Sequence, residues 1–335
     1  MSRTYTLLAD IGGTYARFAL ADPSAAMPLV ADSVRACPVA SSSSPEDAAR
    51  RYLQETGARV DRAVFAIAAR ISGDQAHMLN HPWVVSRSGL CEQLGLVDAA
   101  LVNDFTAQAM AVPLLGPDDY AVIGSAPWQP LRRHADDVLT DQVLAVVGPG
   151  TGLGVGGLVV RDGRAHPLDS EGGHVSFAPD SALELSILEH LSTRFDRVSN
   201  ERLVCGPGLV NIHRALAEMA GDDPGSPEPA DITAAAIAGD PRSAQALEVF
   251  CDVFGAIAGD LVLTLGAWQG VFLTGGMVPK LLGQLRGSGF RQRFEHKGRF
   301  SATMARVPSV AVLHRHPGLL GAAAIASQQP GGDPG

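Results

Sequence analysis

One carboxylate, Asp104, stands where α/β proteins often carry out chemistry. It follows an apolar run, residues 99–102, that predicts a strand, and it precedes residues 105–112, whose pattern predicts a helix. The carboxyl ends of strands are where such folds place reactive groups, and a carboxylate there can accept the proton of a substrate hydroxyl. An aspartate before a helix can equally be its N-cap, so both roles remain open for Asp104.

A second group of polar residues lies around two adjacent glycines and further along the chain. Glu171 and His174 flank Gly172 and Gly173, and Glu201 follows a Ser-Asn pair. A tight loop can hold such acceptors and donors against the hydroxyl groups of a sugar. Taken alone, a histidine of this kind is usually a structural residue, and Glu201 would be an acidic residue in the first turn of a helix.

Three glycine clusters, at residues 12–13, 148–154 and 275–276, need an explanation. Each could be a turn that requires a positive φ, or a cradle in which backbone N–H groups reach the oxygens of a phosphate. A Walker A loop is excluded because no Gly-Lys-Ser/Thr sequence occurs. Residues 152–157 match the G-x-G-x-x-G pattern, but a strand follows where a dinucleotide site requires a helix, so we regard this match as false.

The third cluster differs because it joins two kinds of element. Residues 270–276 read as a buried strand that ends in Gly275 and Gly276, and residues 277–286 predict a helix. Such a junction lets a flat ligand such as adenine approach the backbone closely.

Two similar hairpins are the first elements needed to hold these residues. Residues 6–22 read as a strand, a glycine turn and a second strand. The stretches that begin at Leu7 and Leu144 share this pattern, each with a turn that ends in Gly-Thr. Two such hairpins from two halves of the chain could face each other across a cleft.

Other local signals complete the outline of the chain. Ser44 is a predicted N-cap, with Pro45 as the first residue of a helix that ends at Gly57. Residues 62–68 predict a strand. Exposed loops are expected at residues 127–142 and 221–231, and a disordered tail at residues 328–335.

Composition restricts the class of protein. The 335 residues suggest about two domains, and 46% hydrophobic with 18% charged residues is globular composition. A net charge of −9 argues against nucleic acid as the main partner, and no apolar run is long enough to cross a membrane. The four cysteines lie far apart in the sequence, which favours reduced thiols in the cytoplasm and argues against a structural zinc site.

The hairpin sequences resemble those of a known superfamily. Residues 9–14 and 148–154 resemble the two phosphate hairpins of the actin-like ATPases and sugar kinases, and residues 274–276 resemble their adenosine motif. Four more stretches, in family order, resemble bacterial glucokinases over the chain from Leu7 to about Ala326: LVNDFTAQAMAVPLL from Leu101, SEGGHVSFAP from Ser170, ERLVCGPGLVNIHRAL from Glu201 and HPGLLGAAA from His316.

This resemblance implies an α/β chain with a two-domain, actin-like (ribonuclease H-like) fold, each domain a mixed β-sheet flanked by helices. It places residues 1–109 and about 306–327 in a small N-terminal domain with the first hairpin and Asp104. Residues 110–305 would form a large domain with the second hairpin, the sugar-binding loops and the adenosine motif. Closure of the two domains would exclude water from the cleft.

The same resemblance implies an ATP-dependent glucokinase, which transfers the γ-phosphate of ATP to the 6-hydroxyl of D-glucose. It implies Mg²⁺ but no zinc, and a cytoplasmic homodimer with no nucleic-acid or membrane partner. Asp104 would be the catalytic base, and Asp10 would orient Mg²⁺ through water. Glucose would contact Asn80, Asn103, Asp104, Glu171, His174 and Glu201. ATP would contact Ala9, Asp10, Ile11, Gly12, Gly13, Thr14, Gly150, Thr151, Gly152, Gly275 and Gly276.

Two departures from the family pattern leave an alternative open. Ala9 replaces a usual glycine, and Arg70 replaces a usual proline at a strand end that leads toward the sugar. The alternative is therefore a kinase of another hexose, such as fructose, mannose or N-acetylglucosamine. The related repressor/kinase group would carry a cysteine-rich zinc motif after His174, a regulator would need a DNA-binding extension before Asp10, and a chaperone-type ATPase would lack the sugar cluster.

Overall fold

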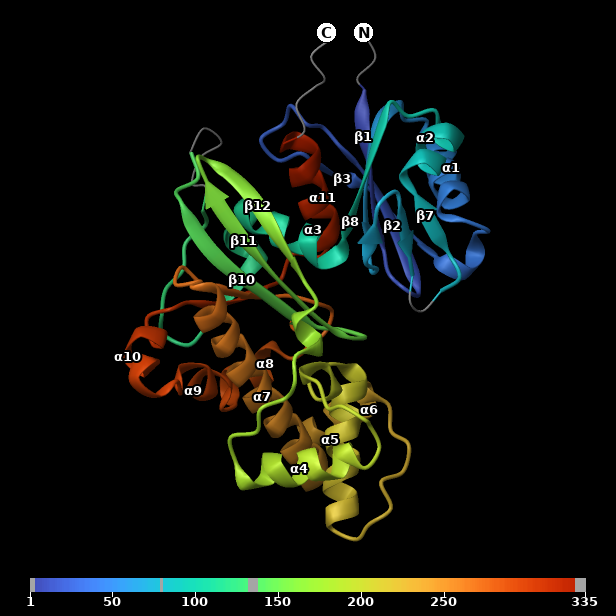
Figure 1. Cartoon of the computed structure of the whole chain (residues 1–335). Helices are drawn as coiled ribbons and strands as arrows, with labels where there is room; N and C mark the ends of the chain where they lie inside the picture. Colours follow the sequence, from blue (N-terminus) through green and yellow to red (C-terminus); the bar gives the residue numbers. More distant parts are fainter. Residues whose placement is uncertain (1–3, 79–80, 132–137, 329–335) are drawn as a thin grey trace.

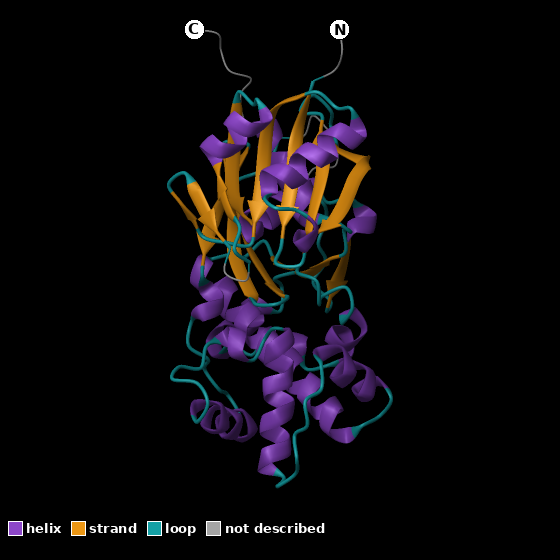
Figure 2. Ribbon diagram, turned by 90° about the vertical axis from the view of Figure 1, so that its right-hand side faces the viewer, coloured by secondary structure: helices purple, strands orange, loops and turns teal. Residues whose placement is uncertain are grey.

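The computed structural model describes residues 4–78, 81–131 and 138–328. The chain forms two units, each built on a larger mixed sheet, with two helices packed between the sheets (Figure 1). Turned by 90°, the molecule has its strands gathered toward one end and a group of helices at the other (Figure 2). Among the described residues, no helix is both long and apolar enough to cross a membrane.

The first unit contains a five-stranded sheet. Its strands lie in the order β3 (Leu29–Pro38), β2 (Tyr15–Ala21), β1 (Tyr5–Ile11), β4 (Val60–Ile67) and β8 (Asp98–Asn103). β1 pairs antiparallel with β2 and parallel with β4. One face packs against α1 (Pro45–Thr56), α2 (Arg87–Leu94) and a small sheet of β5 (Ile71–Ser72), β6 (Gln75–His77) and β7 (Val84–Ser86).

The second sheet repeats this order and adds one strand. It runs β12 (Arg164–Ser170), β11 (Leu153–Arg161), β10 (Gln142–Pro149), β13 (Val271–Leu273), β14 (Ser309–Val312) and β9 (Tyr120–Ile123). β10 pairs antiparallel with β11 and parallel with β13, as β1 does with β2 and β4. The repeat inferred from the two hairpins is therefore confirmed as a repeat of strand order.

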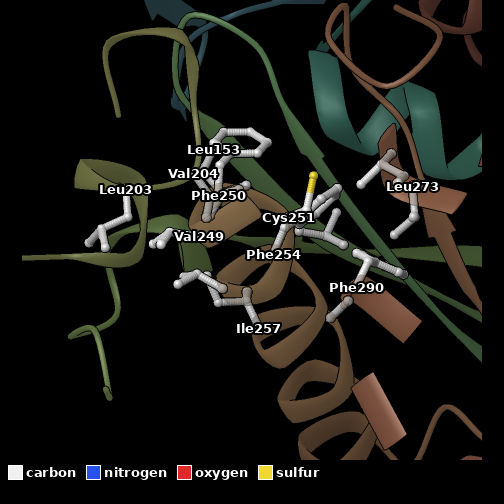
Figure 3. Packing of buried hydrophobic residues seen from close by; sticks show 14 of the residues in the cluster. Leu153, Leu203, Val204, Val249, Phe250, Cys251, Phe254, Ile257, Leu273 and Phe290 are labelled. Carbon is white, nitrogen blue, oxygen red and sulfur yellow. The ribbon is translucent and has the colours of Figure 1, made fainter. Parts of the chain in front are cut away.

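Helices of the second unit share one hydrophobic core with this sheet. They are α4 (Ala182–Ser192), α5 (Gly206–Met219), α6 (Pro229–Ile237), α7 (Pro241–Leu265), α8 (Leu282–Gly287), α9 (Phe290–Glu295) and α10 (Ser301–Met304). Of these helices, α7 packs directly on β10. Phe254 of α7 meets Phe290 of α9 edge to face, with ring centroids 5.4 Å apart. Leu153, the first residue of β11, belongs to the same buried cluster, so this core also anchors the second hairpin (Figure 3).

Two helices, α3 (Asp104–Ala111) and α11 (Pro317–Gln328), lie side by side between the sheets (Figure 1). Leu319 and Ala322 of α11 pack on the first sheet, whereas Leu320 of α11 and Met110 of α3 pack on the second. The two backbones approach so closely at Gly321 that a Cβ there would lie 1.6 Å from the carbonyl oxygen of Ala107. Only glycine fits at this contact.

Local signals predicted some element ends and missed others. α1 begins as expected: the Ser44 side chain accepts a hydrogen bond from the Asp47 N–H, and Gly57 ends the helix at φ +62°. The helix expected from Met277 instead begins at Leu282, because residues 276–281 form successive turns that start with the Met277 N–H bonded to the Pro149 carbonyl.

Four further expectations need correction. The domain boundary expected near residue 306 is wrong. β14 (Ser309–Val312) pairs in the second sheet, and of the segments after residue 306 only α11 packs on the first sheet. The loop expected at residues 221–231 ends earlier, since α6 begins at Pro229, and Gln142 belongs to β10. Gln328, expected in the disordered tail, is the last residue of α11; the rest of that tail, and residues 132–137 of the other loop, lie outside the described residues.

The contact between α3 and α11 predicts a large cost for one added methyl group. Gly321→Ala should lower the free energy of unfolding by about 2–3 kcal/mol, because the helices must move apart. Gly283→Ala is the matched control: Gly283 lies in α8, and no atom lies within 4 Å of the position that its Cβ would take, so alanine should stabilise the chain by up to about 1 kcal/mol. Urea unfolding of both variants checks this, and equal stabilities would contradict the close contact.

Candidate active site

A cleft of about 1210 Å³ opens between the two units. Asp10, Arg17, Asp104 and Gln108 line it from the first unit and from α3, and residues 314–318 line it where the chain enters α11. The second unit contributes the hairpin tip at Gly150 and Thr151, parts of α5 and α6, and the turns after β13. The cleft thus gathers residues from distant parts of the sequence.

Asp104 is the first residue of α3 and does not cap it. The cap is Asn103, whose Oδ1 accepts hydrogen bonds from the N–H groups of Phe105 (2.8 Å) and Thr106 (3.4 Å). The Nδ2 of Asn103 donates to the carbonyl oxygen of Ala69 at 3.2 Å, which leaves one N–H of this amide for another partner. The alternative role considered for Asp104 is therefore wrong, and its carboxylate is available in the cleft.

The electrostatics of Asp104 suit a base. Burial and, next, the negative charge of Asp10 raise the pKa of Asp104 to about 6; Glu171 adds a smaller upward effect, and the hydrogen bond from the Phe105 N–H opposes the shift. The fold therefore brings Asp104, Asp10 and Glu171 close enough to interact, although they are far apart in the sequence. A carboxylate with a pKa near 6 is ionised at neutral pH and still accepts a proton readily.

Asp10 lies on β1 opposite Arg17 of β2, and their charged groups are 3.8 Å apart. Burial raises the pKa of Asp10, and the Arg17 guanidinium opposes this shift. The first turn of α11 touches the same carboxylate, because a Cβ on Gly318 would lie 2.8 Å from the Asp10 Cγ. Sequence reasoning missed Gly318, and the only signal for it was the His-Pro-Gly sequence at the start of a helix.

Glu201 joins the predicted sugar site to the second hairpin. It lies in a short 3₁₀ helix, not in the first turn of an α-helix, and its Oε2 accepts a hydrogen bond from the Leu153 N–H at 2.9 Å. A Cβ on Gly152 would lie 2.4 Å from that same oxygen. The hairpin tip is held from the other side by a hydrogen bond from the Gly206 N–H to the Gly150 carbonyl at 2.9 Å.

The remaining predicted sugar residues follow β12. His174 is exposed on a 3₁₀ turn that starts after Glu171, and its Nδ1 lies 4.0 Å from the Glu201 Oε1. Thus Glu171 is close enough to Asp104 to raise its pKa, and the His174 ring lies near the Glu201 carboxylate. Asn80, the last residue predicted to contact glucose, lies outside the described residues.

Half of the clustered glycines allow close packing, and most of the clustered glycines do not have a positive φ. Within the three clusters, only Gly275 has one, at +85°. A Cβ on Gly148 would lie 2.2 Å from the Thr274 carbonyl oxygen, and one on Gly154 would lie 1.9 Å from the Phe105 ring. Phe105, which sequence reasoning treated only as a helical residue, therefore presses the start of α3 onto the second hairpin.

The residues predicted to bind ATP separate into three groups. Ala9 and Ile11 are fully buried in β1, so they could meet a nucleotide only through the backbone. Gly13, Thr14 and Gly152 lie at the hairpin tips and do not line the cleft. The others line it: Asp10, Gly12, Gly150, Thr151, Gly275 and Gly276.

Beyond the glycines, the cleft ends in a largely apolar pocket that sequence reasoning did not predict. Its walls come from α5, α6 and the turns after β13, and they include Val210, Asn211, Ala230, Thr233, Ala234, Ile237, Met277, Pro279 and Leu281. Such a surface can hold a flat heterocycle. It starts at Val210, about one helical turn after Gly206, the first residue of α5, whose N–H bonds to the hairpin tip.

Asp10 is the cleft carboxylate that best suits a hard cation. The only ion pair of Asp10 among the described residues is the long one to Arg17, so its oxygens can take a ligand such as Mg²⁺, which commonly binds one or two carboxylates and otherwise waters and phosphates. No group of three or more His, Cys, Asp and Glu side chains suited to a metal occurs in the described residues. All four cysteines are free thiols, and burial raises the pKa of Cys205 and Cys251 to about 12.

Comparison with known proteins identifies the family. The family model described as Glucokinase matches residues 7–329. A glucokinase of Stenotrophomonas maltophilia is 59% identical over 329 residues, which cover 98% of this chain and 97% of that protein. The chain belongs to the glucokinase family. Its relatives in Xanthomonas oryzae, also named glucokinase, are 58% identical over 98% of this chain and 97% of their own length.

Solved structures agree with this assignment. A glucokinase from an Antarctic psychrotroph is 33% identical, with a TM-score of 0.84 over 97% of this chain and 99% of that one. A glucokinase of Streptomyces griseus from the repressor/kinase group, solved with glucose and AMPPNP, is 18% identical and has a TM-score of 0.63 over 96% of this chain and 98% of that one. The second likeness concerns the fold alone, which is the expected actin-like architecture of two mixed sheets flanked by helices.

The pKa of Asp104 predicts the acid limb of the activity. Since a base must be ionised, kcat/KM for the sugar should fall about tenfold per pH unit below about pH 6 and level off above pH 7. Glu171→Gln removes a like charge, so the inflection should move to lower pH even if the overall rate also falls. Initial rates between pH 5 and 8 give both curves, and an unchanged or raised inflection in Glu171→Gln would be the contrary result.

Proposed function

We propose that the chain transfers the γ-phosphate of ATP to the 6-hydroxyl of D-glucose, giving glucose 6-phosphate and ADP. The observation that carries this proposal is the Asp104 carboxylate, which is free of capping duty and lies in a cleft that both hairpins enter. Membership of the glucokinase family supports the same reaction. A carboxylate at this place can take the hydroxyl proton as the oxygen attacks phosphorus.

On the sugar side, we assign hydroxyl contacts to Asn103, Glu171, His174 and Glu201, together with Asn80 and Asp104. Support comes from the free N–H of the Asn103 amide and from the exposed His174 ring. The Oε1 of Glu201 also remains available, because only its Oε2 accepts the Leu153 N–H. Donors and acceptors held in this way can distinguish hexoses by the directions of their hydroxyl groups.

On the nucleotide side, we assign the phosphates to the backbone around Gly12 and around Gly150 and Thr151, with the tip residues Gly13, Thr14 and Gly152. Gly275 and Gly276 would border the ribose, and the apolar pocket between α5 and α6 would hold adenine. Mg²⁺, oriented by Asp10 through water, would supply positive charge to the phosphate oxygens. The Asp10 carboxylate suits this role because its side chain faces the cleft with one long ion pair.

Exclusion of water would come from movement of the two units. We propose that residues up to about 109, with α11, move as one domain against the rest of the chain, with β14 now counted in the second domain. The cleft lies between these parts, so closure would bring the sugar and the nucleotide together. An open site would otherwise let water compete with the sugar for the phosphate.

The setting and partners remain part of the proposal. Free cysteines fit a reducing cytoplasm, and the acidic net charge of −9 does not favour nucleic acid or an anionic membrane surface. We expect a homodimer, which size-exclusion chromatography with light scattering would test.

Replacement of Asp104 separates catalysis from folding. Asp104→Asn should lower kcat at least about 10²-fold. At pH 7 the charged carboxylate is less favourable in the fold than in the unfolded chain, so the variant should gain about 1–2 kcal/mol in free energy of unfolding. That gain should disappear below about pH 4, where Asp104 is protonated in both the folded and the unfolded chain. A folded variant with normal turnover would show that Asp104 is not the catalytic base.

A panel of sugars tests the substrate. Glucose should give a higher kcat/KM than fructose, mannose or N-acetylglucosamine in a coupled assay of ADP formation. Arg70 is the reason to test other hexoses. It is exposed and follows Ala69, whose carbonyl accepts the hydrogen bond from the Asn103 amide. A higher kcat/KM for one of the other sugars would change the substrate, and Arg70→Pro would then be expected to shift the preference toward glucose.

A further inference from the structure

Gln108 lines the cleft on the same helix face as Asp104. The two residues are four positions apart in α3, so their side chains lie one above the other. Nothing in the reaction described so far uses Gln108.

The orientation of the Gln108 amide is fixed by the end of β13. The Thr274 hydroxyl donates a hydrogen bond to the Gln108 Oε1 at 2.6 Å. Thr274 is itself rigid, because it is only 2% exposed, its N–H donates to the Val147 carbonyl at 2.9 Å, and its own carbonyl packs against Gly148. The acceptor end of the amide is therefore occupied.

The donor end of the amide faces the cleft. Its Nε2 carries two N–H groups, and no described residue accepts a hydrogen bond from it. The same cleft is lined by Asp10 and Asp104, and by Thr151 and Gly275 of the second unit. This is the region that a phosphoryl group must cross between a nucleotide on the hairpins and a hydroxyl group at Asp104.

We propose that Gln108 is a further catalytic residue, whose Nε2 donates hydrogen bonds to the oxygens of the phosphoryl group during transfer. This rests on the proposed kinase function. In that step the bond between the γ-phosphorus and its bridging oxygen breaks, the bond from the sugar oxygen forms, and the hydroxyl proton goes to Asp104. Gln108 gains and loses no atoms. Its N–H groups stabilise the negative charge on the oxygens of the phosphoryl group in the transition state.

The competing explanation is that Gln108 only ties α3 to β13 through Thr274. The two explanations differ in what a loss of the N–H donors does. Gln108→Glu keeps the shape and leaves an oxygen for the Thr274 hydroxyl, but it removes the donors and adds a negative charge. We expect kcat to fall by about 10²-fold or more, with the KM for glucose changed much less. Gln54→Glu, the same change on the exposed face of α1, is the matched control and should leave both constants unaltered.

A binding measurement provides a readout other than activity. ADP with aluminium fluoride and glucose mimics the phosphoryl group in transit, whereas ADP alone does not. In Gln108→Met, which also lacks the donors, affinity for the mimic should fall at least about tenfold more than affinity for ADP. Calorimetry of the folded protein measures both affinities. A residue that merely connects two elements would weaken both ligands equally or neither.

Each result decides the matter. Gln108→Glu with kcat within threefold of the unaltered chain would overturn the proposal, as would equal losses of affinity for the mimic and for ADP in Gln108→Met. Should Gln108→Glu fail to fold, Gln108→Met supplies both measurements. An unaltered chain without sugar kinase activity would overturn the proposed function together with this role, whereas normal activity with an unaffected Gln108→Glu would overturn this role only.

Discussion

The contact between α3 and α11 at Gly321 is the constraint on which the rest of the cleft depends. α3 carries Asp104 and Gln108, and α11 begins beside Asp10. The approach of the two helix backbones therefore contributes to the distance between Asp104 and Asp10, and a glycine makes this close approach possible. The pKa of Asp104 is raised in part by this proximity, because the repulsion from the Asp10 carboxylate is the largest charge–charge effect on Asp104.

Repetition of one strand order explains how two hairpins come to line one cleft. Each sheet starts with three antiparallel strands and continues with two parallel ones, so each places its first hairpin at the same corner. Because α3 and α11 pack between the sheets, the two hairpin tips lie across the cleft from each other. A single supersecondary pattern, used twice, thus supplies both sides of the proposed phosphate site.

Local patterns in the sequence were enough for features determined locally. The two hairpins, the Ser44 cap of α1 and the strand before Asp104 all follow from neighbouring residues. Features that depend on distant contacts could not be predicted from the sequence. The Asn103 side chain that caps α3 is oriented by its hydrogen bond to the Ala69 carbonyl. Position 154 requires a glycine because the Phe105 ring packs against it. The helix expected from Met277 failed for a similar reason, since the backbone there forms turns against the second hairpin, with Met277 N–H bonded to the Pro149 carbonyl at 3.3 Å.

The hydrogen bond from Leu153 to Glu201 connects the proposed sugar site to the proposed phosphate site. With the contacts proposed above, a sugar hydroxyl that orders the Glu201 carboxylate would also order the start of β11, so part of the conformational entropy of nucleotide binding would already be lost when ATP binds. Thermodynamic linkage would make this effect mutual: each substrate would tighten the binding of the other by the same factor. Two ligands that never share a protein contact would in this way assemble a ternary complex cooperatively.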